Sequence, residues 1–311
     1  MKAKVNRPRL GTAARREERA AYLFLSPWLI GLALFWLFPI VASVVISLTR
    51  WDIIGGAPQW IGLQNYQDML DDRKFWVSIQ VTLEYIVLSV PLYIVAGLGL
   101  SLLLNQKIRG INVFRTIMFL PSVVSGVAVA VLWVALLNPD LGVVNDILRG
   151  IGISHPPRWL GSPFWAVPSV VLVGLWGIGG GAIIYLAGLQ NIGAQLYEAA
   201  LMDGASLWQR FRYVTFPMMT PTLLFVLLTS LIGAFQVFDL AYVLGGSTGA
   251  TGDALSFYLL YMWRVAFGQG QFGYAAALAW VLTVVSALLI VAIFRTSGKW
   301  VYYEYDPNQA R

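Results

Sequence analysis

Long segments without a charged residue constrain the fold of this chain more than any other feature. The first, residues 23–48, contains no Asp, Glu, Lys or Arg, and about 20 apolar residues are enough for a helix to cross a bilayer. It is too long for the core of a signal peptide, and no convincing cleavage site follows, so we expect it to be retained. Only 12% of the 311 residues are charged and 58% are hydrophobic, whereas soluble domains carry about 25% charged residues. The sequence therefore predicts an integral membrane protein.

Five more apolar segments follow the first one. Their approximate ranges are 76–104, 117–137, 164–189, 217–244 and 273–294. Free peptide groups find no hydrogen-bond partner in lipid, so segments of this length cross as helices. We expect an all-α polytopic membrane protein with six transmembrane helices. Its expected parts are a basic tail (1–20), a six-span transmembrane domain (21–297) and a second tail (298–311).

The distribution of positive charge predicts the orientation of these spans. With the N-terminus in the cytoplasm, the inner segments hold fifteen of the 21 Lys and Arg residues and the outer segments hold six. Inner loops are normally the positive ones. We therefore expect both termini in the cytoplasm. The formal net charge of +6 reports topology, because it is too dispersed to bind nucleic acid.

The residues that carry enzyme chemistry are missing from the sequence. There is no cysteine, and the single histidine, His155, lies in a Pro-rich loop where a solvated role is expected. No phosphate-binding Gly-x4-Gly-Lys-Ser/Thr motif, paired carboxylates or nucleophile elbow occurs. We expect no catalytic residue, no metal site and no bound cofactor, and the chain should not hydrolyse ATP itself.

The segment 198–217 is a polar island between two apolar segments, and its pattern predicts a helix, a tight turn and a second helix. Gly204 stands where a helix end needs a left-handed residue, which glycine adopts at little cost. Ser206 followed by Gln209 is a capping-box pattern for the second helix. Pro217 should stop that helix or open the next span. We expect this segment on the cytoplasmic side.

The same residues resemble the EAA loop of permease subunits in ATP-binding-cassette importers. The match includes Glu198, Ala199, Ala200 and Gly204; the longer form, with Asp203, Ala205, Phe211 and Pro221, is similar to the carbohydrate-importer branch of maltose and glycerol-phosphate type permeases. The ending Val-Thr-Phe-Pro at 214–217 departs conservatively from the family's Ile-x-Leu-Pro, and Gly193 replaces a frequent proline. The resemblance extends over nearly the whole chain, and the coupling loop corresponds to residues 190–217.

What the resemblance implies is a transport subunit that works with several partners. These are a homologous second permease, two cytoplasmic ATPase subunits that hold the ATP and Mg²⁺, and an extracytoplasmic solute-binding protein. The substrate would be a sugar or oligosaccharide, and the location would be the inner membrane of a bacterial cell. The residues expected to couple transport to the ATPase are Glu198, Ala199, Ala200, Asp203, Gly204, Phe211 and Pro217.

Five residues in the predicted spans are candidates for the substrate pathway. Trp176 and Gly177 begin the run Trp-Gly-Ile-Gly-Gly-Gly, which can line a cavity or permit close helix packing. Gln236 precedes Asp239 by about one helical turn, in a segment that resembles one lining the sugar pathway of the family. Asp239 can instead help to break its helix. Glu84, the other acid inside a predicted span, fits a functional role or a group that reaches the membrane interface.

Two other functions are compatible with the sequence. One is a permease of the same class for a solute other than a sugar. The other is a secondary transporter driven by an ion gradient, although such folds depend on acids or broken helices near the middle of the membrane. A purely structural membrane scaffold is a weaker third alternative.

Overall fold

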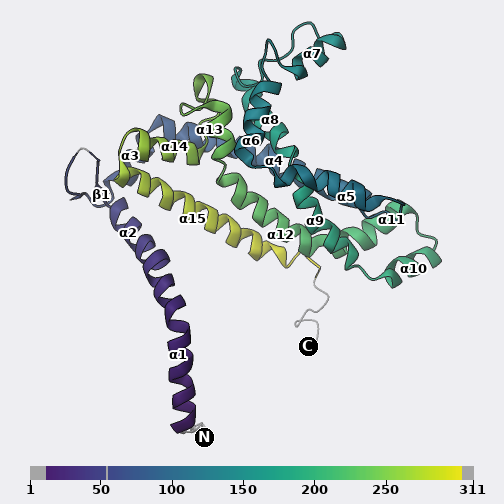
Figure 1. Ribbon diagram of the computed structural model, residues 1–311, viewed down its shortest axis with the longest axis horizontal. Coiled ribbons are helices and arrows are strands. Elements are labelled where there is room, and N and C mark those ends of the chain that lie inside the picture. Colours follow the sequence, from purple (N-terminus) through teal and green to yellow (C-terminus); the bar gives the residue numbers. More distant parts are fainter. Residues whose placement is uncertain (1–11, 54, 303–311) are drawn as a thin grey trace.

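The computed structural model describes residues 12–53 and 55–302 and is almost entirely helical (Figure 1). The only strands in this part of the chain are β1 (Thr49–Arg50) and β2 (Gln59–Trp60), which pair antiparallel with Thr49 opposite Trp60. The outer parts of the two expected tails, residues 1–11 and 303–311, lie outside the described residues. The predicted all-α fold is confirmed.

Four continuous helical segments are long and apolar enough to cross a membrane, namely Arg16–Ser47, Arg73–Leu104, Leu207–Phe235 and Phe272–Ser297. Their elements are α1 (Thr12–Leu32), η1 (Ala33–Leu37) and α2 (Phe38–Ser47); α4 (Arg73–Leu104); α11 (Leu207–Arg210), η3 (Phe211–Thr215) and α12 (Phe216–Phe235); and α15 (Phe272–Ser297). The first helix therefore begins inside the expected polar tail.

Two further spans are bent pairs of helices. The first joins α5 (Ile111–Phe119) and η2 (Leu120–Val123) to α6 (Gly126–Leu136) through a bend of 92°. The second joins α8 (Pro163–Leu175) to α9 (Ile178–Gln190) at 56°. Counting each pair as one span gives the six predicted spans. The third begins at Ile111, six residues before the expected start.

Short elements connect these spans. They are α3 (Gln64–Asp71), α7 (Val143–Gly150), α10 (Ala194–Met202), α13 (Asp239–Gly245), η4 (Thr251–Asp253), α14 (Tyr258–Trp263) and η5 (Arg264–Gly268). Figure 1 places β1, α3 and α14 at one end of the bundle, the β1 end, and α10 with the last turn of α15 towards the other, the α10 end.

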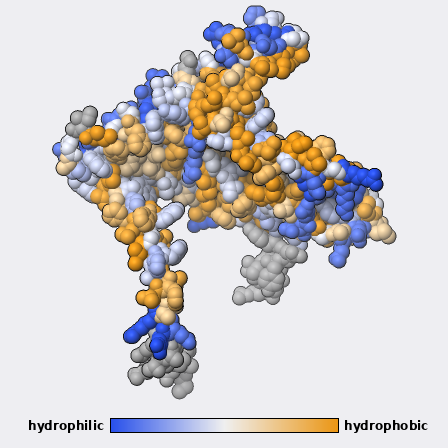
Figure 2. All heavy atoms as spheres, in the orientation of Figure 1, coloured by the Kyte–Doolittle hydropathy of each residue, from blue (hydrophilic) through white to orange (hydrophobic). Residues whose placement is uncertain are grey.

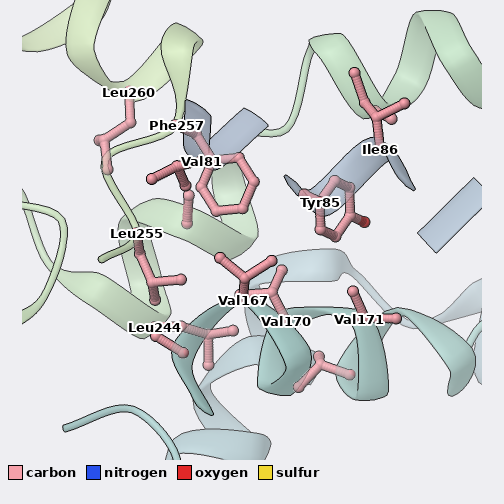
Figure 3. Packing of buried hydrophobic residues seen from close by; sticks show 14 of the residues in the cluster. Val81, Tyr85, Ile86, Val167, Val170, Val171, Leu244, Leu255, Phe257 and Leu260 are labelled. Atoms are coloured by element: carbon pink, nitrogen blue, oxygen red, sulfur yellow. The ribbon is translucent and has the colours of Figure 1, made fainter. Parts of the chain in front are cut away.

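The main core forms around α4, which packs against α8, α9, α12 and α14. Figure 3 shows Tyr85 of α4 on the side of Val167, Val170 and Val171 of α8, with Phe257 beside it, whereas Ile86 points to the opposite side of α4. The rings of Tyr85 and Phe257 meet edge to face at 5.3 Å. Small and β-branched residues on α8 let the two helices approach closely, and residues from both helices contribute to the main core.

Two prolines explain two irregular helical turns. The π-helical segments η1 and η3 each end two residues before a proline, Pro39 and Pro217. A proline inside a helix has no N–H for the carbonyl four residues earlier, and its ring crowds that carbonyl. A local π turn absorbs both effects and lets the helix continue.

The surface is apolar except at the ends of the molecule. In Figure 2 apolar residues cover much of the body and of α1, whereas hydrophilic residues gather at the tip that carries α7 and near α10 and α11. The window of α1 to α2 that fits a membrane has none of its residues buried in this chain. This distribution is the one that a bilayer requires.

Candidate functional site

The loop at the α10 end has the geometry that the sequence predicts. Helix α10 ends at Met202, and Gly204 takes the left-handed conformation with φ +74°. The N–H of Gly204 donates to the carbonyl of Leu201 at 3.0 Å, and the N–H of Ala205 donates to that of Ala200 at 2.9 Å. These two bonds form a Schellman motif, which satisfies carbonyls left free at a helix end. The predicted glycine turn is confirmed.

The second helix of the loop starts with the predicted capping box. The hydroxyl Oγ of Ser206 accepts from the N–H of Gln209 at 3.3 Å, and the side-chain oxygen of Gln209 accepts from the N–H of Ser206 at 2.7 Å. Together these bonds satisfy two donors that the first turn of a helix leaves free. The turn between α10 and α11 is therefore fixed at both sides.

Of the two alternatives for Pro217, the second agrees with the structure. Pro217 does not stop the second helix of the loop but lies at the start of α12, and α11 continues through η3 into α12 as one apolar helix from Leu207 to Phe235. The π turn before Pro217 absorbs the missing hydrogen bond. The second helix of the loop and the fifth span are consequently one continuous helical element of 29 residues, about 43 Å long at 1.5 Å per residue.

The loop is attached to the bundle on one side and free on the other. The hydroxyls of Tyr197 and Thr215 are 3.0 Å apart and hydrogen-bonded, and buried Ile192 packs with Met219 in a local core. On the free side Met202 is 88% exposed, and Leu201, Leu207 and Trp208 are also exposed. A cluster of exposed apolar side chains at a polar end of the molecule indicates a protein contact.

The predicted coupling residues mostly face this free side. Glu198, Ala199, Asp203 and Gly204 are exposed, whereas Ala200, Phe211 and Pro217 are half-buried. Glu198 lies in the second turn of α10, so it is too far from the helix start for the dipole to favour its charge. Phe211 stacks on Trp208 with ring centroids 5.6 Å apart, and this contact holds the Trp208 ring in place. No sequence pattern distinguishes Trp208 from the other tryptophans.

The predicted pathway residues of the fifth span are arranged differently from the expectation. Gln236 caps the C-terminus of α12, and Asp239 is the first residue of the separate helix α13. They do not lie one turn apart on one helix, because the chain leaves helical geometry between them, at Phe238, where φ is −131°. Both side chains are exposed. Asp239 therefore starts a helix, rather than ending one before Gly245.

Trp176 and Gly177 form the bend between α8 and α9. The ring of Trp176 is 44% exposed and meets Trp133 of α6 edge to face, with centroids 6.0 Å apart. The indole N–H of Trp133 is buried and has no acceptor among the described residues. Nothing in the sequence separates Trp133 from the other tryptophans, for which a place at the membrane interface is the ordinary expectation.

The glycines after this bend serve close packing. A β-carbon on Gly179 would overlap the carbonyl group of Met118 in α5, and one on Gly180 would lie 2.9 Å from the side chain of Ser122. Helix α9 therefore rests directly on the backbone of α5. Glu84, on the surface of α4, is exposed and makes no ion pair among the described residues.

Comparisons with known proteins agree with this architecture. Residues 94–307 match the family model described as "Binding-protein-dependent transport system inner membrane component". The lactose transport system permease protein LacF of Rhizobium radiobacter is 37% identical over 272 residues, which cover 86% of this chain and 90% of LacF. The trehalose/maltose transport system permease protein MalF of Thermococcus litoralis is 34% identical, with 92% and 95% covered.

Solved structures give the same result. A chain from the crystal structure of a bacterial ABC transporter involved in the import of the acidic polysaccharide alginate has a TM-score of 0.80 and 25% identity, and the match covers 91% of this chain and 96% of that one. A second matching structure is that of the bacterial alginate ABC transporter in complex with an alginate pentasaccharide-bound periplasmic protein. The chain therefore belongs to the family of binding-protein-dependent transport system inner membrane components, the family that its segment from Glu198 to Pro217 resembles.

Proposed function

We propose that this chain is a non-catalytic permease subunit of an ATP-driven importer for a sugar or oligosaccharide. Relatives named for lactose and for trehalose and maltose, and the structural likeness to an alginate importer, support the substrate class. The observation that carries the proposal is the loop from α10 to α11, with its fixed turn, its exposed apolar side chains and its continuity with α12. ATP and Mg²⁺ would be held by a separate ATPase.

The continuity of α11 with α12 supplies a mechanism of coupling. A force applied by an ATPase to Trp208, in the first turn of the 29-residue helix, would move that helix as one lever. The lever ends at Phe235, shortly before the non-helical residue Phe238, where the chain can change direction without bending a helix. Closure of the ATPase on ATP would thus rotate α12 inside the bundle, and hydrolysis would return it. Each state must differ in its contacts for this to occur.

The proposed assembly contains a second, homologous permease, two ATPase subunits and an extracytoplasmic solute-binding protein. The docking face would be the exposed side of α10 and α11, where Glu198 can pair with a basic group and Leu201 and Leu207 can fill an apolar groove. A periplasmic protein is present in the related alginate complex, which supports the last partner.

We propose a bacterial inner membrane location with both termini and the α10 end in the cytoplasm, because fifteen of the 21 Lys and Arg residues lie in the segments on that side. A cysteine at Ser154 should then react with an impermeant maleimide from outside, and a cysteine at Met202 should react only after permeabilisation. Met202 suits this test in the permease expressed without its ATPase, which would cover this residue, because Met202 is 88% exposed and its side chain makes no cap. The native chain has no cysteine that would add background. The opposite labelling pattern would reverse the orientation and place the coupling loop outside the cell.

The pathway is proposed to pass Trp176 and Gln236. Trp176 presents a flat apolar face, Gln236 an exposed amide, and Trp133 a buried N–H without an acceptor among the described residues. Sugars are bound by such combinations of ring faces and hydrogen-bonding groups. A buried donor without an acceptor, such as the indole N–H of Trp133, costs about 1–3 kcal/mol, and an oxygen of a bound sugar would remove that cost. Gly177, Asp239 and Glu84 are further candidates for the same pathway.

Trp176→Ala and Gln236→Ala are each expected to lower kcat/KM for sugar uptake by about tenfold, which corresponds to the loss of about 1.4 kcal/mol of binding. Uptake into proteoliposomes at matched protein content measures this effect. Trp36→Ala, which removes a 67% exposed tryptophan from η1, is the matched control and should leave uptake unchanged. Normal kinetics in both pathway variants would remove these residues from the substrate pathway.

A further inference from the structure

A polar cavity of about 370 Å³ lies at the β1 end, between β1, α3 and the first turns of α4 and α15. It is lined by Arg50, Trp51, Asp52, Asn65, Asp68, Asp72, Gln271 and Tyr274. None of these residues belongs to the coupling loop or to the proposed sugar pathway. The cavity is within the size range of sites for small organic groups.

Opposite charges share this cavity without pairing. Arg50 forms no ion pair with Asp52, Asp68 or Asp72, since the salt bridges among the described residues involve other arginines. Asn65 is only 6% exposed and donates its amide N–H groups to the carbonyls of Ser47 at 2.8 Å and Thr49 at 2.9 Å. Its side-chain oxygen has no donor among the described residues. The cavity thus offers one unpaired cation, several anions and a free acceptor.

Asp72 remains charged in this cavity. Burial alone would raise the pKa of Asp72, but hydrogen bonds from the hydroxyls of Tyr261 and Tyr274 and from two backbone N–H groups hold the pKa below its usual value. Asp72 also caps α4 through the N–H of Lys74 at 2.8 Å. Its carboxylate is therefore a fixed negative charge. Asp68 accepts one hydrogen bond, from the side-chain N–H of Gln64 at 2.8 Å, and the carboxylate of Asp52 accepts none among the described residues.

A second, apolar groove of about 430 Å³ lies along α2 and α15, and it shares no residue with the cavity, although its Tyr66 directly follows Asn65 of the cavity on α3. Its lining is Val44, Tyr66, Trp280, Val281, Val284 and Val285. The indole N–H of Trp280 donates to Ser43 at 3.2 Å, and the hydroxyl of Tyr66 donates to Ser47 at 2.9 Å, which hold α15 and α3 against α2. Trp280 follows Tyr274 of the cavity by six residues on α15, a distance of about 9 Å. The groove therefore lies further along α15 than the cavity, in the apolar part of the bundle.

We propose that the cavity and the groove together form a binding site for a phospholipid of the phosphatidylethanolamine type. The phosphate would pair with Arg50, the primary ammonium would donate to Asp52 and Asp68, and one acyl chain would lie between α2 and α15. Charge-assisted hydrogen bonds of this kind are the strong ones. Burial of a hydrocarbon chain gains about 0.8 kcal/mol per CH₂ when the chain comes from water, but the acyl chain of a lipid comes from the apolar bilayer and gains little. The headgroup, rather than the chain, therefore selects this lipid from the bilayer.

The charges of the cavity favour this headgroup over other common ones. Phosphatidylglycerol has a phosphate but no cation, so three carboxylates would repel it. Phosphatidylcholine has a cation without N–H donors, so Asp52 and Asp68 would keep their attraction but lose hydrogen bonds. The expected order of affinity is therefore ethanolamine, choline, then glycerol.

Native mass spectrometry of the complete, delipidated transporter complex tests the site. Equimolar phosphatidylethanolamine, phosphatidylcholine and phosphatidylglycerol are added, and free phosphoethanolamine is added in a separate series. We expect about tenfold more phosphatidylethanolamine than phosphatidylglycerol bound to the wild type. Arg50→Gln should reduce binding of all three lipids, and the double variant Asp52→Asn, Asp68→Asn should remove the preference for ethanolamine over glycerol.

Matched variants separate the site from general effects of charge and volume. Arg158→Gln and Asp140→Asn change exposed charges outside the cavity and should leave lipid selectivity unchanged. Val284→Trp should fill the groove and block the bound lipid, whereas Val291→Trp, at an exposed valine of α15 outside the groove, should not. Asp72 is left intact because it caps α4.

Three results would overturn the proposal. The first is equal binding of the three lipids by the wild type. The second is binding of free phosphoethanolamine as tight as that of the lipid, which would make the cavity a site for a soluble phosphate ester. The third is cross-linking of a cysteine at Val284 to the second permease subunit, which would show that a protein helix covers the groove.

Discussion

In a complete transporter that carries Gly204→Val, the number of sugar molecules imported per ATP hydrolysed should fall about tenfold, while the permease still reaches the membrane. Gly204 has φ +74°, and the two hydrogen bonds of the helix end depend on this conformation. A non-glycine residue pays about 1–2 kcal/mol to adopt it, and a β-branched residue pays more. The turn would open and displace α10, although all six spans would still form.

Two further variants isolate the backbone effect in this prediction. A β-carbon at Gly204 would meet no atom within 4 Å, so crowding is not the cause of the loss. Gly204→Asn should retain most coupling, because asparagine tolerates the left-handed region. Gly193→Val, at a position in the same loop with an ordinary φ of −59°, should behave like the wild type. If Gly204→Asn and Gly204→Val lost coupling equally, the left-handed turn would not be the reason.

Gly179→Ala should lower the thermal stability of the permease more than any other alanine substitution in the glycine run. Its β-carbon would overlap the carbonyl group of Met118, which belongs to the backbone of α5 and cannot rotate away. Overpacking of this kind costs about 1–3 kcal/mol or more, which is a fall of about 5 °C in the apparent Tm for a chain of this size. Fluorescence-detected gel filtration after heating measures it.

The neighbouring glycine supplies the control for this effect. Gly181 is exposed, and a β-carbon there would have no atom within 4 Å. Gly181→Ala should therefore leave the Tm unchanged or raise it slightly through better helix propensity. Loss of sugar uptake in Gly179→Ala at unchanged Tm would contradict the packing role and return these glycines to the substrate pathway.

The coupling loop could be predicted well because local rules determine it. A left-handed turn at Gly204 requires glycine or asparagine, and a capping box needs only Ser206 and Gln209 at the right spacing. The spans likewise follow from hydrophobic length. These features depend on neighbours within a few residues, so no tertiary structure was needed to see them.

The breaks and bends could not be predicted in the same way. Apolar residues dominate the segment from Pro217 towards Leu244, yet the helix ends at Phe235 and restarts at Asp239, where α13 packs on α6. Pro217 suggested a helix boundary, but a π turn absorbs its missing N–H. Where a helix ends or continues depends here on contacts between distant segments, which override local propensity.

The grouping of polar residues at the β1 end was also beyond the sequence. Arg50, Asn65, Asp72 and Tyr274 are far apart in the chain and meet only because α3 and α15 pack beside α2. Trp133 and Trp176 are likewise brought together by the bend between α8 and α9. Composition offers no means of separating these side chains from ordinary residues of the membrane interface.

The central claim is that ATP hydrolysis drives transport through the loop from α10 to α11. The most direct measurement is sugar uptake and ATP hydrolysis in the same proteoliposomes, containing the complete complex and its solute-binding protein. We expect uptake to require ATP, to persist after ionophores collapse all ion gradients, and to follow hydrolysis in proportion only in the wild type, while Glu198→Lys hydrolyses ATP with little uptake or loses its ATPase. Uptake that runs on an ion gradient without ATP, or wild-type uptake per ATP in Glu198→Lys, would contradict the account.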